Sequence, residues 1–147
     1  MSNTVLFRIS SVLWSIWGRV HMLAGVLTVE KVLSGEIALA IGGIADAVDP
    51  ATLAGDYPAA LGAILGQHGF NLLWIGVVTT IGGAFVWKGR RPAVLISALV
   101  GGLADVGYFL FMELGGHVKF MPGTLMTLVS ASAIILSGIA YYRVRGE

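Results

Sequence analysis

Residues 58–91 read PAALGAILGQHGFNLLWIGVVTTIGGAFVWKGRR, and they give the clearest indication of the fold class. From Pro58 to Trp87 it contains no Asp, Glu, Lys or Arg, and a basic cluster follows at once. About 20 apolar residues in a helix are enough to cross the hydrocarbon core of a bilayer. The stretch therefore predicts a transmembrane helix whose basic end lies on the cytoplasmic side.

The composition of the whole chain agrees with a membrane location. Of its 147 residues, 56% are hydrophobic and 12% are charged, and the mean hydropathy is +0.87; soluble domains carry about 25% charged residues. The chain has no cysteine, which excludes disulfides, thiolate metal sites and thiol nucleophiles. A net charge of +1 provides no basic surface for nucleic acid. We therefore expect an all-α integral membrane protein of one domain, residues 1–147, with the lipid bilayer as partner and no nucleic acid.

Four stretches meet the length requirement, which predicts a bundle of four transmembrane helices. Their expected bounds are about 4–32, 58–87, 92–114 and 123–142. We expect the first to be a retained helix, since Arg19 and His21 interrupt the apolar run that a signal peptide would need. Residues 34–57 contain turn signals such as Gly42-Gly43 and Asp49-Pro50. This segment is expected to be re-entrant or to lie at the surface, with a short fifth span as the alternative.

Loop charges predict the orientation of the bundle. Basic residues lie near both termini and in the link after the second span: Arg8, Lys88, Arg90, Arg91, Arg143 and Arg145. The 34–57 segment carries no Lys or Arg but four acidic residues: Glu36, Asp46, Asp49 and Asp56. The positive-inside rule then places both termini in the cytoplasm and residues 34–57 outside. We expect a multi-pass protein of a bacterial inner or cell membrane.

Three ionisable residues interrupt the apolar spans at a similar depth. At 1.5 Å of rise per residue, His21, His68 and Asp105 lie ~13–17 Å below the outer face. Because an ionisable group within a span is costly, it marks a functional site by default. Asn71 lies one turn from His68 and Tyr108 one turn from Asp105, so each can face the same way as its neighbour. The pattern predicts a polar layer inside the bundle.

A structural interpretation of these residues stands beside the functional one. A histidine in a membrane helix can simply hydrogen-bond a neighbouring carbonyl. Asp105 could be the structural partner of Arg19 or His21, and Asn71 and Tyr108 could be ordinary polar helix contacts. From the residues alone, both interpretations are open.

The histidines point to haem more than to a bare metal ion. Imidazole is a good iron ligand, and the chain has neither cysteine nor a histidine pair at helical spacing for a zinc or di-iron site. We expect His68 to be the metal ligand, ahead of His21 and His117, because Gly66 and Gly69 flank it. Small residues beside an axial histidine leave room for a flat macrocycle, so His68, Gly69, Gly66 and His21 are the predicted cofactor-binding residues.

Several short motifs, in the same order along the chain, resemble the styrene oxide isomerase family. They are His21, Gln67-His68-Gly69 followed by Asn71, the run DVGYFLF at 105–111 and FMPG at 120–123. The resemblance implies a small four-span enzyme that forms a homotrimer and binds ferric haem b, with His68 as axial ligand. It also implies that a hydrophobic aryl epoxide becomes an aldehyde through Lewis-acid ring opening and a 1,2-hydride shift.

On this interpretation Asn71, Asp105 and Tyr108 are the expected catalytic residues. Asn71 and Tyr108 would donate hydrogen bonds, and an ionised Asp105 would stabilise developing positive charge. The chain departs from the family pattern at Asp105, where an asparagine is expected, and at Gly101 or Gly102, where an aspartate is expected. The alternatives are a haem-binding or electron-transfer subunit without isomerase activity, a proton-relay transporter, and a scaffold subunit whose polar residues join helices.

Overall fold

The computed structural model describes residues 2–145, which form helices and no strand. The helices are α1 (Asn3–Leu33), α2 (Ile37–Ile44), α3 (Ala59–Trp87), α4 (Arg91–Tyr108) and α5 (Leu125–Arg145), with a 3-10 helix at Pro50–Leu53 and π-helical turns at Phe109–Glu113 and Phe120–Thr124. Four stretches are long and apolar enough to cross a membrane: Asn3–Leu33, Ala59–Trp87, Arg91–Glu113 and Phe120–Val144. This confirms the expected all-α architecture with four candidate spans.

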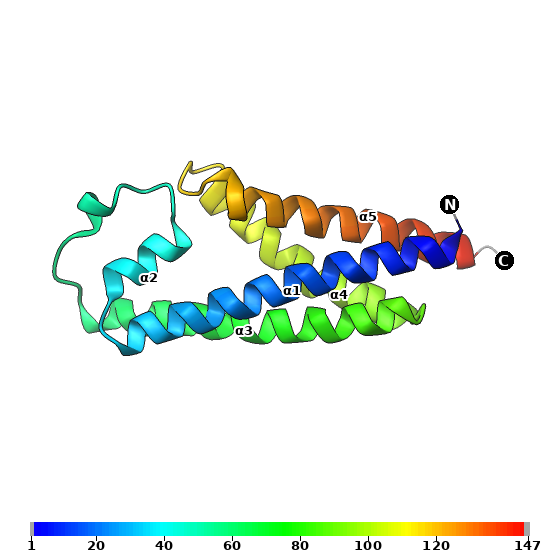
Figure 1. The fold of residues 1–147 in the computed structure, drawn as a ribbon, viewed down its shortest axis with the longest axis horizontal. Coiled ribbons are helices and arrows are strands. Elements are labelled where there is room, and N and C mark those ends of the chain that lie inside the picture. The colour runs from blue at the N-terminus through cyan, green and yellow to red at the C-terminus, as the bar shows by residue number, and fades with distance from the viewer. Residues whose placement is uncertain (1, 146–147) are drawn as a thin grey trace.

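Each long helix makes its most extensive backbone contacts with two others. α1 lies against α3 and α5, and α4 contacts the same two helices, so that the four enclose a common interior. In Figure 1, α4 and α5 diverge from α1 and α3 toward the end of the bundle where α2 lies. This is the end at which the polar residues of the predicted layer are found.

Glycines bring the backbones of α1 and α3 into direct contact. A Cβ placed on Gly25 would lie 2.5 Å from the carbonyl oxygen of Gly69, and one placed on Gly18 would lie 2.7 Å from that of Gly76. Distances this short leave no room for a side chain, as is typical where membrane helices pack through small residues. The two helices therefore form one firm wall, which carries His21 on α1 and His68 on α3.

Two tryptophans fill the centre of the bundle. Trp14 and Trp17 on α1 are both fully buried, and their rings meet edge to face with centroids 5.9 Å apart. A Cβ placed on Gly101 of α4 would lie 2.5 Å from the Trp14 ring. Tryptophans of membrane proteins are often interfacial, but these two serve as core residues that hold α1 against α4.

α1 begins and α5 ends at the same end of the bundle, where the α3–α4 link also lies (Figure 1). There the guanidinium carbon of Arg8 lies 5.2 Å from the centroid of the Trp87 ring, and Arg91 Nη2 donates a 2.8 Å hydrogen bond to the Val144 carbonyl oxygen. Basic residues thus gather at one end of the bundle. An even number of spans puts both termini and the α3–α4 link on the same side, and the positive-inside rule then expects the basic residues there. That this end faces the cytoplasm stays a prediction.

At the opposite end, the segment after α2 is tied to the α4–α5 loop. The Lys119 N–H donates a 2.7 Å hydrogen bond to Asp46 Oδ1, and the Ala47 N–H donates one of 3.1 Å to the His117 carbonyl oxygen. α2 has 8 residues, far fewer than the ~20 needed to cross a bilayer. The alternative of a fifth span is therefore wrong, and residues 34–57 form a cap that reaches across this end of the bundle.

Candidate functional site

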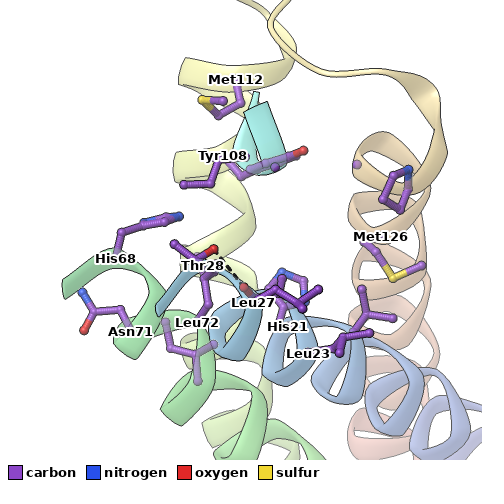
Figure 2. Close-up of a pocket in the computed structure, with 18 of the residues that line it drawn as sticks. His21, Leu23, Leu27, Thr28, His68, Asn71, Leu72, Tyr108, Met112 and Met126 are labelled. Carbon is purple, nitrogen blue, oxygen red and sulfur yellow. Dashed lines mark hydrogen bonds between the residues drawn. The ribbon is translucent and has the colours of Figure 1, made fainter. Parts of the chain in front are cut away.

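The five residues predicted to form a polar layer line one cavity of about 830 Å³: His21, His68, Asn71, Asp105 and Tyr108. Its volume is within the ~300–1,000 Å³ common for small-molecule and cofactor sites. Figure 2 shows His21 on α1, His68 and Asn71 on α3, and Tyr108 on α4 around this space. The residues predicted from their positions along the helices to form one polar layer therefore do lie around one cavity.

The rest of the lining is largely apolar. Leu23 and Leu27 from α1, Leu72 from α3, Met112 after α4 and Met126 from α5 surround the polar groups (Figure 2). α2 adds a further wall with residues 39, 40, 43 and 44. Methionine side chains adapt to irregular shapes. The cavity is thus suited to an apolar molecule that a few polar groups orient.

The preceding turn of α1 fixes the tautomer and the ring orientation of His21. Its Nδ1 donates a 2.9 Å hydrogen bond to the Trp17 carbonyl oxygen, and its ring stacks on the Trp17 indole with centroids 3.6 Å apart and planes at 22°. Because a carbonyl can only accept, Nδ1 carries the proton, and in the neutral ring Nε2 carries the lone pair.

Nε2 of His21 accepts no hydrogen bond from the described residues. It is not among their fully buried polar atoms without a partner, which are Trp14 Nε1 and Ser97 Oγ, so Nε2 is accessible. His21 is half-buried and lines the cavity. A ligand in the cavity can therefore meet an unpaired imidazole nitrogen.

Asp105 is buried and fastens three helices together. Its Oδ2 accepts a 2.9 Å hydrogen bond from Trp17 Nε1 on α1 and another from the Ser130 hydroxyl on α5. The structural alternative of a bond to Arg19 or His21 is not found, because the hydrogen-bond partners of Asp105 among the described residues are Trp17 and Ser130. Asp105 Oδ1 receives no hydrogen bond from the described residues, so it is left for the cavity that the residue lines.

His68 and Asn71 lie at the exposed edge of the cavity on α3. Asn71 Oδ1 accepts a 3.0 Å hydrogen bond from Trp74 Nε1, which leaves the Asn71 amide N–H groups to donate. The His68 ring makes no hydrogen bond to any described residue. At the other side of the cavity, the half-buried Tyr108 hydroxyl lies against the backbone of Gly123 and likewise has no partner within residues 2–145.

The other predicted site residues lie elsewhere. Gly66 and Gly69 do not line the cavity; both face α1, and Gly69 is buried in the contact between α1 and α3. Gly69 therefore provides close helix packing, and Gly66 makes an ordinary contact with Val32 of α1. His117 is exposed in the α4–α5 loop, and its carbonyl oxygen accepts the hydrogen bond from the Ala47 N–H described above.

Sequence reasoning did not single out Trp17, Ser130 or the walls of the cavity. Trp17 could have been found, because it precedes His21 by four residues and so shares a helix face with it. Nothing comparable marks Ser130, which is one of several hydroxyl residues in its helix. Its role depends on how α5 is rotated against α4.

The imidazole groups of the cavity could each supply one ligand to a metal or a haem. In the part of the chain described, no group of three or more His, Cys, Asp or Glu side chains could hold a metal ion. A haem iron already has four porphyrin nitrogens and needs only an axial ligand from the protein, which one imidazole supplies. No family model matches the chain, and no curated protein or solved structure matches it. The function of the cavity is therefore inferred from its own residues.

Proposed function

We propose that the protein is a membrane-embedded, haem-dependent isomerase that converts an aryl epoxide to an aldehyde. The observation that carries this proposal is the cavity, which combines imidazole, amide and phenol groups with largely apolar walls inside the bundle. A hydrophobic epoxide dissolves in lipid and matches such walls. The order of short motifs that resembles the styrene oxide isomerase family supports the same chemistry.

Ferric haem b agrees with the donor set. His21 and His68 each have an imidazole nitrogen without a protein partner, and both line the cavity; the resemblance implies His68 as the ligand. A ferric haem bound here would supply a Lewis acid for the epoxide oxygen.

The chain's own groups would orient the substrate and exclude water. The Asn71 amide and the Tyr108 hydroxyl are free to donate hydrogen bonds to a polar oxygen. Opening of the epoxide builds positive charge at the benzylic carbon, which water would trap as a diol. The leucine and methionine walls keep water away, so that a hydride can shift from the neighbouring carbon. Asp105, held through one oxygen, leaves its other oxygen to stabilise the positive charge.

We also propose a homotrimer in a bacterial inner or cell membrane, with the basic end in the cytoplasm. Arg19, Gln67, His68 and Asn71 are exposed although they lie within candidate spans. Polar groups that face lipid at this depth are costly, and a neighbouring copy would cover them. The number of copies follows from the family resemblance.

A haem-binding or electron-transfer subunit without isomerase activity is the second candidate. It is favoured by the bonds of Asp105, since a residue that joins α1, α4 and α5 already has a structural role. A proton-relay transporter would use the same polar residues without haem and would be colourless.

The test is to give the purified ferric protein styrene oxide and to identify the product by gas chromatography. We expect phenylacetaldehyde, formed only by the haem-loaded protein, with haem-free protein as the matched control. A red protein that leaves the epoxide untouched, or forms only the diol, would favour the second candidate. A protein that takes up no haem would contradict both.

A further inference from the structure

We propose that His21 ligates the haem iron through Nε2, with Trp17 and Asp105 as the residues that position its ring. The inference rests on the proposed haem. It differs from the family resemblance, which implies His68 as the ligand.

The hydrogen bond of His21 is the one that a metal-bound histidine needs. Histidines that bind metals nearly always donate the N–H of their other ring nitrogen to a carboxylate, a backbone carbonyl or water. In His21 this donor is Nδ1, which lies 2.9 Å from the Trp17 carbonyl oxygen. The bond fixes the tautomer that leaves the lone pair on Nε2. This nitrogen has no hydrogen-bond partner among the described residues, and His21 lines the cavity.

The plane of the His21 ring is also fixed. The ring stacks on the Trp17 indole at 3.6 Å between centroids, and that indole is fully buried. Trp17 is held in turn by its 2.9 Å hydrogen bond to Asp105, which Ser130 bonds from a third helix. Asp105 therefore acts on His21 through Trp17, and three helices hold the imidazole in place before any ligand binds.

His68 lacks this support. It is exposed, and neither ring nitrogen has a hydrogen-bond partner among the described residues. Within one copy of the chain, ligation by His68 would have to immobilise a free side chain and would leave its second nitrogen without an acceptor. The preorganised donor of the cavity is His21.

The experiment compares His21→Gly with His68→Gly in haemin titrations of the purified protein, followed by optical absorption. We expect His21→Gly to lose the haem absorption of the wild type and to regain it with free imidazole, which fills the space left by the ring. His68→Gly should keep its haem. Recovery with imidazole separates loss of a ligand from misfolding, and size-exclusion chromatography provides a second check.

Trp17→Phe tests the positioning role, because it keeps an aromatic ring for stacking but loses the N–H that bonds Asp105. We expect haem to bind roughly 10-fold more weakly, the lower end of the loss seen when the support of a metal ligand is weakened, because the carbonyl bond to His21 is kept but the stacked ring is no longer held by Asp105. The iron–histidine stretch in the Raman spectrum of the reduced protein should change. His21→Gly that binds haem with the wild-type spectrum would overturn the assignment of His21 but leave the proposed haem intact. A wild-type protein that binds no haem would overturn the proposed function itself.

Discussion

A methyl group added at Gly25 tests whether direct contact between α1 and α3 builds the wall of the cavity. Gly25 lies one turn after His21 and faces Gly69, the neighbour of His68. In Gly25→Ala the new Cβ would lie 2.5 Å from the Gly69 carbonyl oxygen and 2.6 Å from the backbone nitrogen of Leu73. Both atoms belong to the backbone of α3, so no side-chain rotation relieves the overlap, and the helices must separate.

The expected loss of unfolding free energy is obtained by comparison with a glycine at which an added methyl group would contact nothing. Overpacking of this kind costs about 1–3 kcal/mol of unfolding free energy. Alanine also favours a helix over glycine by roughly 0.5–1 kcal/mol, and Gly138→Ala isolates this gain, because nothing lies within 4 Å of the added Cβ. Both variants share the helix gain, so their difference is the packing cost. For a chain of this length it corresponds to a gap in Tm of about 2–12 °C.

The assay is the fraction of protein that stays monodisperse by size-exclusion chromatography in detergent after heating to a series of temperatures. Gly25→Ala should lose its folded state at a lower temperature than Gly138→Ala, and it should bind haem more weakly because the wall between His21 and His68 has moved. Equal Tm values for the two variants would refute the close contact of α1 and α3.

Three further results are expected. Tyr108→Phe should lower the rate of aldehyde formation while the haem absorption stays unchanged; loss of haem instead would show that the hydroxyl acts on the fold and not on the substrate. Asp105→Ala should lower the unfolding free energy by about 1–3 kcal/mol, because it leaves the Trp17 N–H buried without an acceptor, whereas Asp105→Asn keeps an acceptor and most of the stability in the same heating assay. In this cysteine-free chain, an impermeant thiol reagent added outside cells should label Asp49→Cys and not Arg90→Cys; the reverse pattern would invert the topology.

The four candidate spans and the meeting of the polar residues could be predicted because both depend on position along a helix. The apolar run from Pro58 to Trp87 ends at basic residues, and such boundaries are visible in one dimension. Counted from the helix ends that are joined by residues 34–57 and 115–121, the rise per residue predicts that His21, His68 and Asp105 lie in one layer. The cavity that these residues line agrees with that layer.

What could not be predicted depends on how each helix is rotated about its axis. Gly69 sits beside His68 in the sequence, but it faces α1 and not the cavity. The two hydrogen-bond partners of Asp105 come from α1 and α5. Because these spans are apolar nearly all round, their sequences do not indicate which face of each helix packs against which neighbouring helix. The sequence also did not predict that α2 lines the cavity. Its short apolar stretch with two glycines is compatible with a surface segment as well as with a packed helix.

The central claim, that the cavity binds haem through an imidazole, is tested most directly by titrating the purified haem-free protein with haemin and recording the absorption spectrum. We predict a saturable, sharp Soret band of histidine-ligated haem that reaches its limit at a fixed ratio of haem to chain. A spectrum that rises without saturation and matches haemin in empty detergent micelles would contradict the claim.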